Sequence, residues 1–122
     1  MKFQLASAEG FAITGRENGV VRINHIEWRE SFVLFPETGA VAWAGIPINQ
    51  EEAQNAWSTI IEYAPNIVVI GTGNTHKFPH PSLLRPLIDA RIGYEIMDTA
   101  AASRTYNVLI SEGRRVCAAM LV

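Results

Sequence analysis

The chain has 122 residues, of which 48% are hydrophobic and 18% are charged, so it is long and apolar enough to bury one core. Its formal net charge is −2 and its arginines form no basic run, which disfavours nucleic acid as a partner. No apolar stretch approaches the roughly 20 residues of a membrane span, and the first ten residues resemble neither a secretion signal nor a transit peptide. We therefore expect a single domain over residues 1–122, cytoplasmic and without membrane insertion.

The first third of the chain is typical of two antiparallel hairpins. Residues 11–16 and 20–24 flank Asn18-Gly19, a turn sequence suited to positive φ at both positions. Residues 31–35 and 40–44 flank a second turn, Pro36 to Gly39.

A helix should follow over residues 49–64. Asn49 and Glu52 resemble a capping box, apolar residues then recur at helical spacing, and Pro65 prevents continuation. We interpret Glu51 and Glu52 as first-turn residues that interact with the helix dipole rather than as a catalytic pair.

The rest of the chain alternates strands and helices. The apolar run at residues 67–70 predicts a strand that is covered on both faces. A second helix should lie within residues 82–91 and be stopped by Gly93, and another strand should follow at residues 94–97. Thr99 should cap a third helix that ends at Gly113, before a last strand over residues 115–122 that buries the single cysteine, Cys117. This order predicts an α/β fold with a mixed sheet, helices on one face and the hairpin strands on the other.

Two loops of this layout should meet and form a crevice. Parallel strands that end at residues 70 and 97 share one sheet edge, so we expect Gly71, Thr72, Gly73, Asp98 and Thr99 to converge. The free N–H groups of residues 100–102 and the Thr99 hydroxyl would there bind a small anion. The alternative interpretation is that Asp98 or Thr99 only caps the helix and the glycines only turn the chain.

Other sites are less well supported. A dinucleotide fingerprint is disfavoured, because its third glycine would fall on His76. His76 and His80 are separated by a proline and no third ligand is evident, so we predict no metal and no cofactor. The serines lack a nucleophile-elbow context, and we assign no catalytic residue.

The third helix carries neighbouring polar residues. Its predicted apolar arc contains Ala101, Ala102, Thr105, Tyr106, Val108, Leu109 and Ile110, and its polar arc contains Ser103, Arg104, Asn107 and Ser111. Arg104 and Asn107 suit recognition of a carboxylate, a phosphate or a partner backbone. The alternative is a solvated helix face or a link to loop carbonyls.

Several segments together carry a resemblance to a known family: residues 71–73, 97–99, 102–109 and 112–114, with 31–36 and Trp43. They resemble the domain-of-unknown-function 498 family, whose members include mitochondrial respiratory complex I assembly factor 3. The resemblance implies a three-layer β/β/α, Mth-938-like fold with a mixed central sheet whose last strand runs antiparallel. It also implies a shared surface or pocket formed by Gly71, Gly73, Asp98, Thr99, Arg104, Tyr106, Asn107 and Arg114, to which we add Thr72. It implies no enzymatic activity. Many bacterial relatives carry cysteine where this chain has Ser103, which argues against a thiol mechanism, and the lack of a transit peptide favours a bacterial member.

Two functions follow as hypotheses. The leading one is a non-enzymatic assembly or protein-interaction factor with an unidentified protein partner, supporting biogenesis of a membrane or respiratory complex. The alternative is a small-molecule or anion-binding protein, or an enzyme, that uses the crevice at residues 71–73 and Thr99. A deep pocket would favour the alternative, and a flat patch with Arg104 and Asn107 would favour the first.

Overall fold

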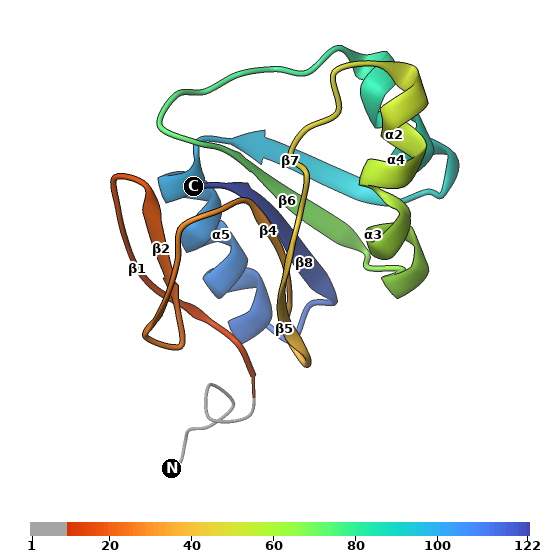
Figure 1. Ribbon diagram of the computed structural model, residues 1–122. Helices are drawn as coiled ribbons and strands as arrows, with labels where there is room; N and C mark the ends of the chain where they lie inside the picture. Colours follow the sequence, from red (N-terminus) through yellow and green to blue (C-terminus); the bar gives the residue numbers. More distant parts are fainter. Residues whose placement is uncertain (1–9) are drawn as a thin grey trace.

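A computed structural model describes residues 10–122, which form a mixed five-stranded sheet, a three-stranded sheet and several helices (Figure 1). The five-stranded sheet has the order β5 (Gly39–Ala42), β4 (Phe32–Phe35), β8 (Val116–Leu121), β6 (Ile67–Thr72) and β7 (Gly93–Met97). The mixed sheet and the α/β class are confirmed. One detail is corrected: β8, the last strand, runs parallel to β6 and antiparallel only to β4. The strand that opposes the other four is β4.

The three-stranded antiparallel sheet contains β1 (Ile13–Glu17), β2 (Val20–Ile23) and β3 (Ile26–Trp28). Both predicted hairpins are present, but the sequence did not predict β3. At the first turn only Gly19 has a positive φ, of 74°. The turn with two positive φ angles instead lies between β2 and β3, at Asn24 (48°) and His25 (73°).

The predicted first helix is divided at Trp57 into α2 (Gln50–Ala56) and α3 (Ser58–Tyr63). The side chain of Asn49 caps α2 by accepting a hydrogen bond from the Glu52 amide at 2.9 Å. The Glu52 carboxylate in turn accepts from the Ile48 amide at 3.2 Å. These two bonds confirm the predicted capping arrangement. In a standard capping box the glutamate would accept from the amide of Asn49 itself, whereas here the donor is the residue before it.

The second predicted helix consists of a 3-10 turn, η1 (Pro81–Leu84), and the short helix α4 (Arg85–Asp89). Gly93 does not end it, because Gly93 is already the first residue of β7, and Arg91 makes the turn with a φ of 61°. The third helix, α5 (Thr99–Ser111), ends as predicted, but its cap is Asp98, and Thr99, the predicted cap, is its first residue. The amide of Gly113 (φ 76°) donates to the carbonyl of Ile110, which closes the last turn.

The central sheet is buried on both faces, and a different set of helices covers each face (Figure 1). Trp57, Ile60, Leu84 and Leu87 of α2–α4 and η1 cover one face. Ala102 and Tyr106 of α5 cover the other, together with Ile13, Val21 and Ile23 of the three-stranded sheet. The expectation that all helices lie opposite the hairpin strands is therefore wrong for α5.

The order of the strands explains this difference. The connection from β6 through α4 leads outward to the edge strand β7, whereas the connection from β7 through α5 leads back across β6 to β8. Crossovers between parallel strands are right-handed in nearly all proteins. Two right-handed crossovers that move in opposite directions along one sheet place their helices on opposite faces, so α5 packs beside the hairpin strands.

The structure confirms that Cys117 is buried, as the second residue of β8. Burial raises the pKa of its thiol, so the thiol stays protonated and unreactive at neutral pH. None of the helices within residues 10–122 is both long enough and apolar enough to cross a membrane.

Candidate functional site

The predicted loop residues converge around the hydroxyl of Thr99. Its oxygen accepts a hydrogen bond from the Gly73 amide at 2.7 Å and donates to the carbonyl of Leu121 at 2.5 Å. The amide of Thr99 also donates to the carbonyl of Gly73 at 2.9 Å. One buried side chain thus joins the end of β6, the start of α5 and the end of β8. The bonds between Gly73 and Thr99 confirm that the two predicted loops meet, and the contact with β8 was not predicted. We call this group, Gly71, Thr72, Gly73, Asp98 and Thr99, the junction.

Thr72 shapes the loop that leaves the junction. Its hydroxyl lies 2.5 Å from the carbonyl of Thr75 and 3.3 Å from that of Met97, and it accepts from the amide of Lys77 at 3.3 Å. The residue is buried, so these bonds replace water as partners of its hydroxyl. Thr72 therefore closes a local turn after β6.

Close packing accounts for Gly71. A Cβ atom at this position would lie 2.5 Å from the sulfur of Met120, 2.8 Å from the Thr99 hydroxyl oxygen and 3.1 Å from the Thr99 Cα. Only glycine allows α5 to begin this close to β6. At Gly71 the junction is filled by protein atoms.

Asp98 occupies the start of α5 where an anion was predicted. Its carboxylate accepts from the Ala101 amide at 2.8 Å, and its backbone carbonyl accepts from the Ala102 amide at 2.8 Å. Two of the three amides and the hydroxyl on which the anion prediction rested are therefore bonded within the chain. This geometry matches the alternative interpretation, in which Asp98 caps the helix and the glycines turn the chain.

Tyr106 and Asn107 connect α5 to the three-stranded sheet. The carboxamide of Asn107 accepts from the Ile13 amide at 3.0 Å and donates to the Ile13 carbonyl at 2.7 Å. The hydroxyl of the buried Tyr106 donates to the carbonyl of Phe11 at 2.7 Å. Asn107 thus forms hydrogen bonds with the outward N–H and C=O groups of Ile13, as a neighbouring strand would. We call this pair the clasp.

The two arginines of the predicted site lie on the surface, apart from both groups. Arg104 and Arg114 are exposed, so Arg104 does not share a recognition surface with Asn107, whose amide is used by the clasp. The predicted arcs of α5 also need correction. Ser103 is buried and donates to the Thr99 carbonyl at 2.7 Å, whereas Val108 is 53% exposed. α5 packs against both the sheet and β1, and its buried residues are Thr99, Ala102, Ser103 and Tyr106.

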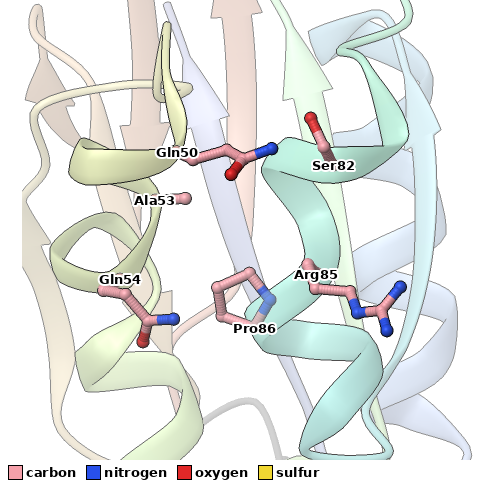
Figure 2. Close-up of a pocket in the computed structure, with 6 residues that line it drawn as sticks. All are labelled: Gln50, Ala53, Gln54, Ser82, Arg85 and Pro86. Atoms are coloured by element: carbon pink, nitrogen blue, oxygen red, sulfur yellow. The ribbon is translucent and has the colours of Figure 1, made fainter.

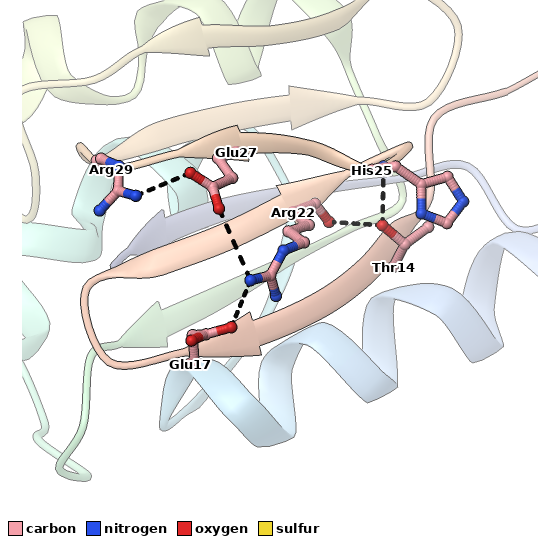
Figure 3. Close-up of polar contacts among 6 residues, drawn as sticks. All are labelled: Thr14, Glu17, Arg22, His25, Glu27 and Arg29. Carbon is pink, nitrogen blue, oxygen red and sulfur yellow. Dashed lines mark hydrogen bonds and ion pairs between the residues drawn. The ribbon is translucent and has the colours of Figure 1, made fainter.

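A charged cluster on the outer face of the three-stranded sheet was not predicted (Figure 3). Arg22 lies between Glu17 and Glu27, and Arg29 also pairs with Glu27. The hydrogen bond from Arg22 lowers the pKa of the Glu17 carboxyl. These pairs are solvent-exposed and add little stability. Residues 17, 22 and 27 come together only through the strand pairing, so the register of β2 and β3 is the signal that would have located them.

Two hollows of the surface lie away from the junction. One is a groove of about 320 Å³ that has α2 on one side and the η1–α4 segment on the other (Figure 2). It is lined by Gln50, Ala53, Gln54, Ser82, Arg85 and Pro86. A second hollow, of about 340 Å³, lies beside β7 and is lined by Phe78, Pro79, Pro81, Leu84, Tyr94 and Ile96. Neither hollow contains a residue of the predicted site. The second hollow was not predicted, because residues 74–81 were interpreted only as a loop with two histidines.

Comparison with known proteins places this architecture in a family. Residues 13–121 match the family described as protein of unknown function (DUF498/DUF598). The mouse protein named NADH dehydrogenase [ubiquinone] 1 alpha subcomplex assembly factor 3 is 35% identical over 91 residues, which are 73% of this chain and 48% of that protein. The chain spans about half the length of the mouse relative.

Two solved bacterial structures share the fold over nearly their whole length. A Bordetella parapertussis protein is 33% identical with a TM-score of 0.79, covering 92% of this chain and 95% of its own. A Bordetella pertussis protein, described as a Mth938-like domain, is 27% identical with a TM-score of 0.78 and covers 99% and 90%, respectively. The chain therefore belongs to the DUF498/DUF598 family and has its Mth938-like fold.

Proposed function

We propose that this chain is a protein-interaction factor that assists the assembly of a membrane-bound respiratory complex and catalyses no reaction of its own. The observation that carries the proposal is the similarity to the mouse complex I assembly factor over 73% of this chain. The chain spans about half of that relative, so we assign the assembly role to this chain only as a proposal. Action from the cytoplasmic side of a bacterial membrane is part of the same proposal.

The internal use of the polar motif residues supports an interaction role over catalysis. The hydroxyls of Thr72, Thr99 and Ser103 are buried and bonded to backbone carbonyls. The Cys117 thiol is buried, and burial raises its pKa. Nucleophilic catalysis needs a group with access to substrate and a lowered pKa or an adjacent base. These groups are instead placed to hold the fold together.

The outer face of α5 is the surface that we propose contacts the partner. Arg104 and Val108 are both exposed and lie one helical turn apart, so they are neighbours on that face. Arginine is enriched at interface hot spots, and the exposed apolar side chain beside it adds surface that a partner can bury. Arg114, which is also exposed, follows the end of α5. Asn107 is left out of this contact because the clasp uses its amide.

The test is affinity purification of the tagged full chain from its source organism after chemical crosslinking, with identification by mass spectrometry. We expect subunits of a membrane-bound NADH dehydrogenase to be enriched, and Arg104→Ala to reduce that enrichment without loss of folding. Arg29→Ala, at an exposed position just after β3, is the control and should retain the partner. Equal recovery with both variants would contradict the proposed surface. A purified protein that carries a small molecule and no partner would replace the interaction role with the ligand-binding one.

A further inference from the structure

Within residues 10–122, the edge strand β7 presents backbone groups that have no hydrogen-bond partner. It is the last strand in the order of the central sheet, and its Gly93 amide donates to the Asn66 carbonyl on the side of β6. Alternate residues of a strand face the same neighbour, so Gly93, Glu95 and Met97 point their backbone groups toward β6. The N–H and C=O groups of Tyr94 and Ile96 therefore point away from the sheet. Within residues 10–122, no loop or side chain forms a hydrogen bond with them.

The side chains of these same two residues line an apolar hollow. Tyr94 and Ile96 form its wall on β7, and Phe78, Pro79, Pro81 and Leu84 complete a space of about 340 Å³. Phe78 is 76% exposed at the rim. A large aromatic side chain left in water next to an apolar hollow is a feature of binding sites rather than of folding cores.

Glu95 gives this edge a charge. Its side chain alternates with those of Tyr94 and Ile96 and so lies on the opposite face of the sheet. It is exposed and belongs to none of the ion pairs found within the described part of the chain. A segment that pairs with β7 would therefore meet apolar side chains on one face and a carboxylate on the other.

We propose that β7 binds an extended segment of a partner protein as an additional strand, with an apolar side chain of that segment in the hollow and a basic side chain beside Glu95. The inference rests on the proposed interaction function and names the chemistry of the segment that the partner contributes. Strand addition of this kind takes affinity from main-chain hydrogen bonds and specificity from pockets for alternate side chains. Tyr94 and Ile96 supply both.

A second copy of the chain is a poorer occupant than a basic segment. The antiparallel register that pairs all five residues of β7 with those of a second copy sets Glu95 directly opposite the same residue of that copy. Like charges directly opposite each other on neighbouring strands are destabilising. A lysine or arginine at that position of a different protein would be attracted instead.

Another strand of the molecule shows how an edge is closed when it is not used. The outward N–H and C=O groups of Ile13 on the edge strand β1 are both bonded by the Asn107 side chain. Proteins commonly protect their edge strands, since open edges pair with other chains. The unprotected edge of β7 beside an apolar hollow contrasts with this closed edge.

A synthetic peptide tests the proposal on the full chain. The probe is fluorescein-labelled Ser-Leu-Lys-Val-Lys-Leu-Ser, whose leucines and valine alternate with lysines, and the matched probe has glutamates in place of the lysines. Fluorescence anisotropy at low salt should show about tenfold tighter binding of the lysine peptide, since each cross-strand charge pair is worth roughly two- to fivefold. Glu95→Lys should reverse the preference. Amide exchange measured by NMR should slow at Tyr94 and Ile96 when the lysine peptide binds.

Two alanine variants locate the contact. Phe78→Ala should weaken peptide binding about fivefold or more, as removal of an interface anchor does. Ile26→Ala removes an apolar side chain that is 66% exposed on the three-stranded sheet, away from β7, and should leave binding unchanged. Circular dichroism confirms that both variants are folded.

Several results would overturn the inference. Failure of the lysine peptide to bind at millimolar concentration, or binding without slower exchange at Tyr94 and Ile96, would exclude strand addition at β7. A dimer in sedimentation experiments that Ile96→Pro abolishes would make a second copy the occupant. If the crosslinked NADH dehydrogenase subunits are recovered equally with the wild type and Phe78→Ala, this inference fails while the proposed function stands. If the wild type recovers no such subunit, the proposed function itself fails.

Discussion

The inner and outer faces of α5 use polar residues for opposite purposes. On the inner face, Thr99, Tyr106 and Asn107 donate to or accept from backbone groups of other elements. On the outer face, Arg104 is exposed to solvent beside Val108. Asn107 lies three positions after Arg104, a rotation of about 60° around the helix axis, and that rotation is enough to separate a structural residue from a surface one. The comparison teaches that a polar motif on a helix contains both kinds of residue, and that the partner of each side chain distinguishes them.

The largest effect is expected for the inner face, from Tyr106→Ala. Removal of this fully buried aromatic side chain should lower the free energy of unfolding by about 3–5 kcal/mol. Tyr106→Phe is the control, because it removes only the hydroxyl bond to Phe11 and should cost about 1–2 kcal/mol. Urea denaturation followed by tryptophan fluorescence measures both. A loss below about 1 kcal/mol for the alanine variant would mean that α5 is not anchored through this residue.

Thr99→Val tests the junction with almost no change of shape. The valine leaves the Gly73 amide and the Leu121 carbonyl without their buried partner, so we expect a loss of about 2–4 kcal/mol. Thr99→Ser retains the hydroxyl and should lose about 1 kcal/mol for one methyl group. The same denaturation experiment compares them. Equal stability of the two variants would show that the hydroxyl does not hold the junction.

Gly71→Ala tests the close approach of α5 to β6. The added methyl group would lie 2.8 Å from the Thr99 hydroxyl oxygen and 3.1 Å from its Cα, and relief of that overlap should cost about 1–3 kcal/mol. Gly93→Ala is the matched control in β7, where the nearest atom would be 3.3 Å away. We expect a shift of the thermal midpoint mainly for the first variant. A larger shift for Gly93→Ala would contradict the packing assigned to the junction.

The smallest effects directly compare the two faces. Asn107→Ala opens the clasp, and since water can reach the freed groups of Ile13 at the edge of β1, we expect a loss of about 1–2 kcal/mol. Arg104→Ala should stay within about 0.5 kcal/mol of the wild type, as most surface changes do. Chemical denaturation of both variants under the same conditions measures the difference in their free energies of unfolding. A stability loss for Arg104→Ala as large as that for Asn107→Ala would remove the distinction between the faces.

Much of the local structure could be predicted because local chemistry determines it. Asn49 and Glu52 mark the start of α2, Gly113 ends α5, and the short apolar run of residues 67–70 lies in β6. The meeting of Gly73 and Thr99 was also predictable, because loops that follow neighbouring parallel strands share one sheet edge. The strand β3 was missed. It has three residues and follows an Asn24-His25 turn, which carries a weaker signal than Asn-Gly.

The sequence by itself determined which residues are polar and which elements carry them, since caps, turns and hydrophobic periodicity act over a few residues. Only the tertiary structure decided what those residues bind. Asn107 meets Ile13 across 94 positions of the chain, and no local pattern encodes that contact. The direction of two crossovers placed α5 on the hairpin side, and that placement turned Asn107 toward β1 and left Arg104 in solvent. Contacts between distant segments depend on how whole elements pack, so the role of each motif residue became readable only in the folded chain.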